Sequence, residues 1–200
     1  MKIGLAQLNT HVGAIEANTA KVLDTARRAR DELGCDLVVF PELTLCGYPP
    51  EDLLFHRGMR RRVQAALEAV RSAADGIALY LGYPEYDAEH IYNSGAFIRA
   101  GTLLARHRKI VLPNYSVFDE KRYFEAGSEP TLVRHEGVTF GLTICEDTWR
   151  AGPCMAAAEA GAEMILILNG SPFHRQKQRE REAVLIERAG QTRRPLLYVN

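Results

Sequence analysis

Alternating apolar and polar stretches divide the first part of the chain into predicted strands and helices. Short, mostly apolar runs at residues 2–8, 36–40 and 77–83 are typical of buried strands. Between these runs, residues 15–33 and 59–74 carry apolar side chains at helical spacing, which predicts two amphipathic helices. Because strand and helix alternate, we expect a parallel sheet that is covered by helices.

The middle of the chain has a different pattern, in which short strands are separated by tight turns. The pattern predicts two hairpins, with strands at residues 92–99, 102–106, 131–135 and 138–144. Gly- and Pro-rich or polar segments follow the second strand and the first hairpin, and they read as long loops. Long loops at the ends of buried strands are common places for functional sites.

After Cys145 the alternation of helix and strand resumes. It predicts helices at 154–160 and 176–191 and strands at 164–168 and 195–199. We therefore expect a mixed sheet with helices outside and antiparallel hairpins in the middle, which differs from a simple doubly wound fold. Since Asn200 directly follows a predicted buried strand, we also expect the chain to be part of a longer protein.

Composition limits the class of protein. The 200 residues are 46% hydrophobic and 25% charged, which is enough apolar material for a core and excludes a disordered chain. The formal net charge is +0, so charge gives no argument for binding nucleic acid or a membrane. The sequence shows neither a signal peptide nor a membrane-spanning run, and we expect a cytoplasmic location.

The chain contains 4 cysteines, at positions 35, 46, 145 and 154. None forms a C-x-x-C pair, and in a protein without a secretion signal we expect free thiols. Neither the cysteines nor the histidines have the spacing of metal ligands, so we expect no metal site.

Polar residues that follow apolar runs supply the candidate chemistry. The run at 138–144 ends at Cys145, a candidate nucleophile, but the adjacent Glu146 and Asp147 disfavour its thiolate. A base and a cation are therefore needed from elsewhere in the chain.

Glu42 and Lys109 follow other predicted strands and are suited to these two roles. Neighbouring parallel strands end at one edge of a sheet, which would bring Glu42, Cys145 and Asn169 together. A backbone N–H after the cysteine would add oxyanion stabilisation of about 3–4 kcal/mol. The natural reaction is acyl transfer through a thioester.

Other interpretations of these residues stay open at this point. A cysteine at the end of a strand is often just a small buried side chain. Glu42 can instead cap a loop or pair with a surface arginine, and Lys109 can be the solvated end of the basic run at residues 106–109. A Cys–His enzyme is a further alternative, because the sequence contains 6 histidines, although none has a recognisable nucleophile spacing.

Four ordered motifs resemble the nitrilase, or carbon–nitrogen hydrolase, superfamily: PELTLCGYPPEDLLF, RKIVLPNYSVFDEKRYFEAG, GLTICEDTW and NGSPFHRQKQRER. The resemblance covers the whole chain. It implies a four-layer α-β-β-α sandwich, a catalytic triad of Glu42, Lys109 and Cys145, and association into homo-oligomers.

The segments GYPPEDLL, CEDTW and SPFH resemble one group within the superfamily, the glutaminase domains of glutamine-dependent NAD+ synthetases. The resemblance implies that residues 1–200 form such a domain, in an incomplete form. It further implies hydrolysis of glutamine to glutamate and ammonia, which a C-terminal synthetase domain uses to amidate deamido-NAD+. ATP and Mg²⁺ would belong to that second domain, and no cofactor is expected in this one.

The resemblance also implies roles for residues around the triad. Glu120 matches a second glutamate that lies close to the lysine and the nucleophile. The expected substrate-binding residues are Tyr115, Glu146, Ser171, Lys177 and Tyr48. Physically, Glu146 suits the α-ammonium of glutamine, and Lys177 offers a point charge for the α-carboxylate without the bidentate geometry of arginine. Two alternatives remain, namely a stand-alone amidase for another small amide and an inactive truncated fragment.

Overall fold

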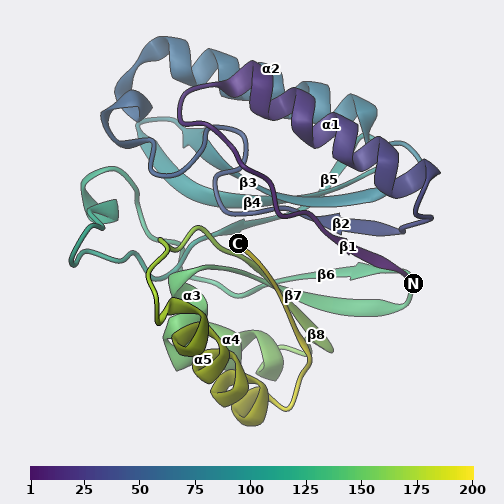
Figure 1. Cartoon of the computed structure of the whole chain (residues 1–200), viewed down its shortest axis with the longest axis vertical. Coiled ribbons are helices and arrows are strands. Elements are labelled where there is room, and N and C mark those ends of the chain that lie inside the picture. Colours follow the sequence, from purple (N-terminus) through teal and green to yellow (C-terminus); the bar gives the residue numbers. More distant parts are fainter.

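The computed structural model describes residues 1–200, which form two β-sheets packed face to face between two layers of helices (Figure 1). One sheet has the strand order β1-β2-β3-β4-β5 and the other β6-β7-β8-β9. This arrangement confirms the four-layer α-β-β-α sandwich that the resemblance implies. None of the helices combines the length and apolar character that a bilayer crossing requires.

The first sheet comes from the N-terminal half of the chain. Its strands are β1 (Ile3–Leu5), β2 (Leu37–Val39), β3 (Ala78–Asp87), β4 (His90–Arg99) and β5 (Thr102–Arg108). The pairs β1–β2 and β2–β3 are parallel, whereas β3–β4 and β4–β5 are antiparallel. Helices α1 (Ile15–Asp31) and α2 (Arg57–Ala73) cover its outer face, and the short 3₁₀ helix η1 (Glu51–Phe55) precedes α2 (Figure 1).

The second sheet comes from the C-terminal half. Its strands are β6 (Thr131–His135), β7 (Val138–Ile144), β8 (Met164–Leu168) and β9 (Leu196–Val199). β6 and β7 form an antiparallel hairpin, and β7, β8 and β9 are parallel. Helices α3 (Glu146–Trp149), α4 (Ala151–Glu159) and α5 (Lys177–Thr192) cover its outer face, and the 3₁₀ helix η2 (Glu120–Arg122) lies in the loop between the sheets.

The core between the sheets follows from the two-residue period of a strand. Leu37 and Val39 on β2 pack toward the second sheet, whereas Val38 packs among the residues under α1 and α2. Across the interface the rings of Phe97 and Phe140 stack with centroids 6.3 Å apart. Strands that are apolar on both faces, as the sequence shows here, are required because each sheet is covered on both sides.

Besides shifts at the ends of several elements, two differences from the sequence predictions affect the architecture. The expectation of one mixed sheet is wrong, because the strands separate into two sheets, each of them mixed. The strand predicted to end at Tyr83 continues to Asp87 and pairs directly with β4. Gly82 and Pro84 interrupt its apolar pattern, but the ladder with β4 maintains the strand through both of them.

Candidate active site

The predicted site residues gather where loops from both sheets meet at one edge of the molecule. Glu42 follows β2 and Lys109 follows β5 in the first sheet, whereas Cys145 follows β7 in the second. Cys145 and Asn169 follow the neighbouring parallel strands β7 and β8 and share one sheet edge, as expected. The expectation is wrong for Glu42, which joins them from the other sheet. The N–H of Glu42 donates to the carbonyl of Asn169 at 3.2 Å, which ties the two sheets together at this point.

A buried cluster of charges surrounds Lys109, whose side chain is 0% exposed. Its Nζ donates to Glu42 Oε1 at 2.7 Å and to Glu120 Oε1 at 2.8 Å. Glu120 Oε1 also accepts from the hydroxyl of Tyr48 at 2.9 Å, and Glu42 Oε1 accepts from Nδ2 of Asn93 at 2.8 Å. One oxygen of each carboxylate is thus held by two donors.

The other carboxylate oxygens, Oε2 of Glu42 and Oε2 of Glu120, are buried and have no hydrogen-bond partner. Buried acceptors without a partner are rare, and at a functional site they mark groups that are available to a reacting molecule. The cluster therefore combines a fixed cation with two carboxylate oxygens that are free to accept protons.

Electrostatics keeps the lysine charged in this environment. Burial alone lowers the pKa of Lys109, but the negative charges of Glu42 and Glu120 outweigh it, so that its pKa lies well above the usual value. Burial raises the pKa of Glu120 to about 7, although Lys109 acts in the opposite direction. Burial and the two neighbouring carboxylates also raise the pKa of Tyr48, whose hydroxyl therefore remains a donor.

Cys145 sits in a strained turn at the end of β7. Its backbone adopts φ 46° and ψ −100°, a region that non-glycine residues rarely occupy and that is often found at functional sites. Its N–H donates to the carbonyl of Leu168 at 2.8 Å, which fixes the turn against β8. Cys145 is the single residue between the end of β7 at Ile144 and the start of α3 at Glu146.

The thiol of Cys145 is buried beside the charge cluster. Burial raises its pKa well above the usual value, the charge of Glu42 raises it further, and Lys109 acts to lower it. From the sequence, Glu146 and Asp147 were expected to disfavour the thiolate of Cys145. In the structure, the main causes of the raised pKa are burial and the charge of Glu42. A thiol close to a carboxylate and a lysine is an arrangement suited to proton transfer from the sulfur to the carboxylate.

Tyr115 and Glu146, two of the predicted substrate-binding residues, lie together. The Tyr115 hydroxyl donates to Glu146 Oε2 at 2.9 Å, and burial together with this bond raises the pKa of Tyr115 to about 12. Glu146 is 4% exposed, and its other oxygen lies 3.5 Å from Nε of the exposed Arg150. The structure thus places a buried carboxylate directly after the candidate nucleophile.

Ser171 and Lys177 have different surroundings. Nε of Arg181 donates to Ser171 Oγ at 2.9 Å, and its Nη2 donates to the Ser171 carbonyl at 3.0 Å. Lys177 Nζ lies 3.9 Å from the ring centroid of Trp149 and 3.3 Å from a Glu180 carboxylate oxygen. Arg181, which the sequence prediction did not include, is therefore the cation in contact with Ser171.

Two further residues of the site were missed by the sequence analysis. Asn93 holds Glu42, and the only signal for it was a polar pair, Asn93-Ser94, inside an otherwise apolar strand. At Gly170 an added Cβ would lie 3.0 Å from Glu42 Oε2 and 3.3 Å from Cγ of Tyr48. The absence of a side chain at this position lets the loop approach the carboxylate, and no sequence pattern identified this requirement.

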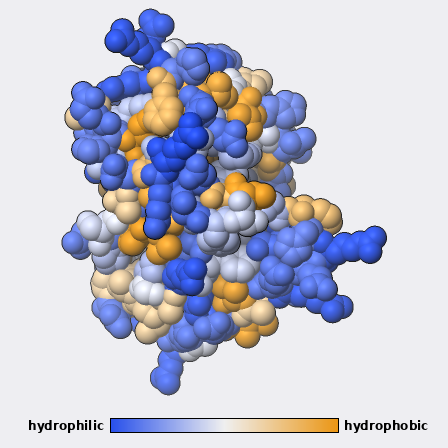
Figure 2. Space-filling model, turned by 90° about the vertical axis from the view of Figure 1, so that its left-hand side faces the viewer, coloured by the Kyte–Doolittle hydropathy of each residue, from blue (hydrophilic) through white to orange (hydrophobic).

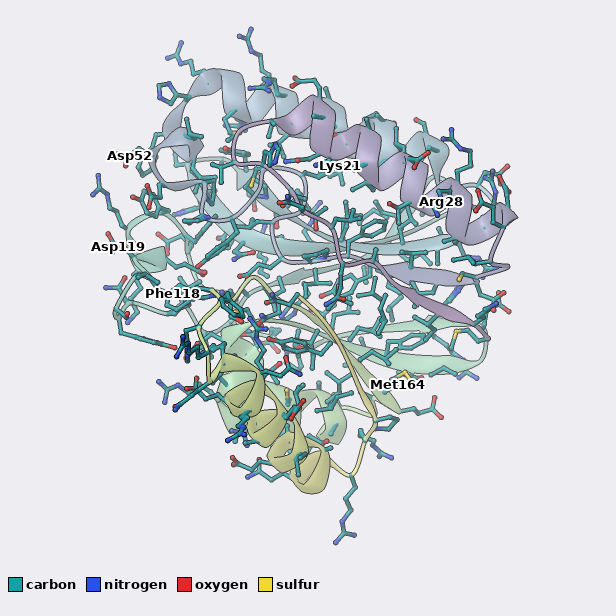
Figure 3. All side chains as sticks on the ribbon, in the orientation of Figure 1. Lys21, Arg28, Asp52, Phe118, Asp119 and Met164 are labelled. Atoms are coloured by element: carbon teal, nitrogen blue, oxygen red, sulfur yellow. The ribbon has the colours of Figure 1, made fainter.

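A cavity of about 270 Å³ lies beside the cluster, between the loop that carries Tyr48 and the loop that carries Glu120. Its lining includes Asp52, Phe118 and Asp119, which Figure 3 shows at the same edge of the molecule. Figure 2 views this edge directly and shows hydrophobic patches among hydrophilic surface. Tyr48 and Glu120 are the residues of the cluster that line this cavity, whereas Glu42, Lys109 and Cys145 lie behind them and are not part of its lining.

The structure contains no group of three or more His, Cys, Asp or Glu side chains arranged to hold a metal ion. The four cysteines are unpaired and buried, which confirms the predicted free thiols.

An α-β-β-α sandwich with a buried Glu–Lys–Cys cluster at the edge of its two sheets has the features of a thiol-dependent hydrolase of amide bonds. Residues 2–200 match the family described as carbon–nitrogen hydrolase, and the chain belongs to that family.

Curated and solved relatives show which members the chain is similar to. The chain is 40% identical over 202 residues to a glutamine-dependent NAD(+) synthetase of Xanthomonas campestris pv. campestris, which covers 100% of this chain and 37% of that protein. A solved glutamine-dependent NAD+ synthetase from Acinetobacter baumannii, in complex with ADP, superposes with a TM-score of 0.95 at 36% identity, covering 99% of this chain and 38% of that one.

A second solved structure is a glutamate-to-glutamine mutant of the amidase from Nesterenkonia sp. AN1, in which acrylamide has added to the active-site cysteine. It superposes with a TM-score of 0.90 at 26% identity, covering 100% of this chain and 78% of the amidase. The chain thus spans 37% of the length of the synthetase relative and most of the length of the amidase.

Proposed function

We propose that residues 1–200 form a glutaminase domain that hydrolyses the side-chain amide of glutamine to glutamate and ammonia. The observation that carries the proposal is the buried carboxylate of Glu146, which directly follows the candidate nucleophile and faces Tyr115. A carboxylate at this position is suited to bind the α-ammonium group of an amino acid. A simple amide has no ammonium group for it to bind. The similarity to proteins named glutamine-dependent NAD(+) synthetase supports the same substrate.

The first half of the reaction forms a thioester. Glu42 takes the proton of the Cys145 thiol as the sulfur attacks the amide carbon, and Lys109 stabilises the negative charge on the carbonyl oxygen. The proton then passes from Glu42 to the amide nitrogen, the carbon–nitrogen bond breaks, and ammonia leaves. The unpartnered Glu42 Oε2 supports this role, because it is available to the thiol and to the leaving group.

The second half of the reaction hydrolyses the thioester. Glu42 removes a proton from water as the water oxygen attacks the thioester carbon. The carbon–sulfur bond breaks to release glutamate, and Glu42 returns the proton to the sulfur, which regenerates the thiol. Glu120, with its unpartnered Oε2 and a pKa raised to about 7 by burial, is suited to hold the amide nitrogen or the water by hydrogen bonds. Lys109 stays charged throughout and links the two glutamates.

The substrate pocket follows from the polar groups around Cys145. Glu146 binds the α-ammonium of glutamine, Tyr115 orients Glu146, and Tyr48 closes the pocket from the Glu42 side. Arg181 orients Ser171 by donating to its hydroxyl oxygen. Either Arg181 or Lys177 supplies the positive charge that binds the α-carboxylate of glutamine.

We further propose that the chain works with an ATP-dependent synthetase domain of the same protein, which uses the ammonia to amidate deamido-NAD+. The length of the synthetase relatives, of which the chain spans 37%, supports a second domain. ATP and Mg²⁺ would act in that domain, where they would activate the carboxylate of deamido-NAD+ for attack by ammonia.

The choice of substrate is tested by comparing glutamine with propionamide, an amide that lacks the amino and carboxylate groups. We expect kcat/KM to be at least about 100-fold higher for glutamine, since ion pairing of the substrate is worth about 1.5–3 kcal/mol per charged hydrogen bond. Glu146→Gln should remove most of this preference while propionamide hydrolysis stays within about twofold.

The second candidate function is a stand-alone amidase for another small amide. The structural likeness to the Nesterenkonia amidase, most of whose length the chain covers, favours it. Equal kcat/KM values for glutamine and propionamide, or equal losses for both substrates in Glu146→Gln, would support the amidase and contradict the glutaminase.

A further inference from the structure

The carboxylate of Asp147 is fully buried and accepts four hydrogen bonds, although the proposed reaction gives it no role. Its Oδ1 accepts from the backbone N–H groups of Ile110 and Val111 at 2.9 and 2.8 Å. Its Oδ2 accepts from the N–H of Ile144 at 3.0 Å and from Nε2 of His107 at 2.9 Å. A carboxylate with this many donors is rigidly held, and it holds its donors in turn.

Three of these four donors flank Lys109 in the sequence, and the fourth directly precedes Cys145. His107 precedes Lys109 by two residues, Ile110 and Val111 follow it, and Ile144 directly precedes Cys145. We propose that Asp147 is a positioning residue that fixes the segment of the catalytic lysine to the turn of the nucleophile. It acts on the reaction through Lys109 and Cys145 and does not touch the substrate.

No other contact of the Lys109 backbone duplicates this function. Its N–H donates to the Asn93 carbonyl at 2.8 Å, which ties it to β4 of the first sheet. Its carbonyl accepts from the N–H of Gly127 at 2.8 Å, in the loop before β6. Asp147 joins this segment to the strand that ends at Cys145, and thus sets the separation of cation and sulfur across the two sheets.

His107 completes the arrangement from the lysine side. Because a carboxylate only accepts, the proton of the imidazole lies on Nε2, facing Asp147. The other ring nitrogen, Nδ1, lies 3.2 Å from Thr131 Oγ1, which orients the ring. The histidine is 1% exposed, so its interaction with Asp147 is shielded from water.

The proposal is tested with Asp147→Asn and Asp147→Ala in the full-length protein. Asn keeps one acceptor oxygen for the two amides after Lys109 but cannot accept from Ile144 or from His107, and Ala loses all four bonds. We expect kcat to fall about 10-fold in Asp147→Asn and at least about 100-fold in Asp147→Ala, while KM changes less than about threefold.

Alkylation of Cys145 by iodoacetamide, measured by peptide mass spectrometry, gives a readout that is independent of the substrate. The proposal rests on the proposed role of Cys145 as nucleophile but not on glutamine. We expect the alkylation rate to fall about 10-fold in Asp147→Asn, because a displaced lysine stabilises the thiolate less. If glutamine were the wrong substrate, turnover would fail in the wild type while this difference in alkylation remained.

Three further variants distinguish the positioning role of Asp147 from a purely structural one. Val70→Ala removes buried volume on α2, far from the site, and should lower Tm without changing kcat or alkylation. If Asp147→Asn likewise changed only Tm, the positioning role would be refuted. Where the Asp147 variants fail to fold, His107→Gln, which keeps a donor, should retain activity that His107→Phe loses, and equal activities of these two would also refute it.

Discussion

At the scale of single residues, the site depends on one cation shared by two buried carboxylates. Lys109 is held by Glu42 and Glu120, and neither glutamate has another cation among its hydrogen-bond partners. Removing one member of a buried ion pair is strongly destabilising, by about 3–5 kcal/mol, because the remaining charge has no compensation. The cluster is therefore a condition for stability as well as for the proposed reaction.

Lys109→Met tests this dependence. We expect the free energy of unfolding to fall by about 3–5 kcal/mol and amide hydrolysis to fall by more than about 1,000-fold, measured by urea denaturation and ammonia release. Lys121→Met, at an exposed position in the neighbouring loop, is the control and should change neither. Normal stability of Lys109→Met would contradict the charge cluster.

Glu120 makes stability depend on pH. Burial raises its folded-state pKa from 4.5 to about 7, so the folded protein binds this proton more tightly than the unfolded chain. The stabilisation is complete below about pH 4.5 and is lost as pH rises to about 7. Urea denaturation should therefore show that the free energy of unfolding of the wild type falls as pH rises from 4.5 to 8. The Glu120→Gln variant should lack this part of the fall. Parallel pH profiles for the two proteins would contradict the raised pKa.

Asn93 is predicted to support Glu42. One hydrogen bond to a charged group contributes about 1.5–3 kcal/mol, which corresponds to about 10–100-fold in rate. We expect Asn93→Ala to lower kcat by that factor with KM nearly unchanged, in steady-state assays of ammonia release. The exposed Asn9→Ala is the matched control, and an unchanged kcat in Asn93→Ala would exclude the role.

At the scale of elements, the apolar pattern predicted nearly all helices and strands. β6, β7 and β8 have the predicted bounds, and α1 and α5 differ by a few residues at their ends. The pattern could not assign the strands to two sheets, because a strand that is buried on both faces reads the same in either sheet. For the same reason, the sequence predicted that Glu42 and Cys145 meet at the edge of one sheet, whereas they belong to two different sheets.

Contacts between elements far apart in sequence were the part of the site that the sequence could not predict. Asn93 reaches Glu42 because β4 pairs with β3, and Asp147 reaches His107 because the two sheets pack face to face. Such contacts depend on register and on sheet packing, which local patterns do not encode. The assignment of Glu42, Lys109 and Cys145 as a catalytic triad came from the family motifs and stays a prediction.

The loop after β8 provides a test of element packing. Gly170→Ala would place a Cβ 3.0 Å from Glu42 Oε2, so we expect the carboxylate to shift and kcat to fall about 10–100-fold with little change in Tm. Gly58→Ala, in α2, meets nothing within 4 Å and should be neutral or slightly stabilising. Full activity of Gly170→Ala would contradict the close approach.

At the scale of the whole molecule, the two sheets divide the proposed reaction between them. The first sheet supplies the base and the cation, and the second supplies the nucleophile and the substrate-binding acid. The reaction therefore requires the sandwich to be closed, with Asp147 and the Glu42–Asn169 backbone bond connecting its halves. The expected homo-oligomer and the expected cytoplasmic location stay predictions.

The central claim is that Cys145 releases ammonia from glutamine for use by a synthetase domain of the same protein. The most direct test is Cys145→Ala in the full-length protein, with NAD+ formation from deamido-NAD+ and ATP measured once with glutamine and once with ammonium chloride. We predict that glutamine-dependent synthesis disappears, while ammonium-dependent synthesis stays within about twofold of the wild type. Retention of glutamine-dependent synthesis, or loss of both activities in a folded protein, would contradict the account.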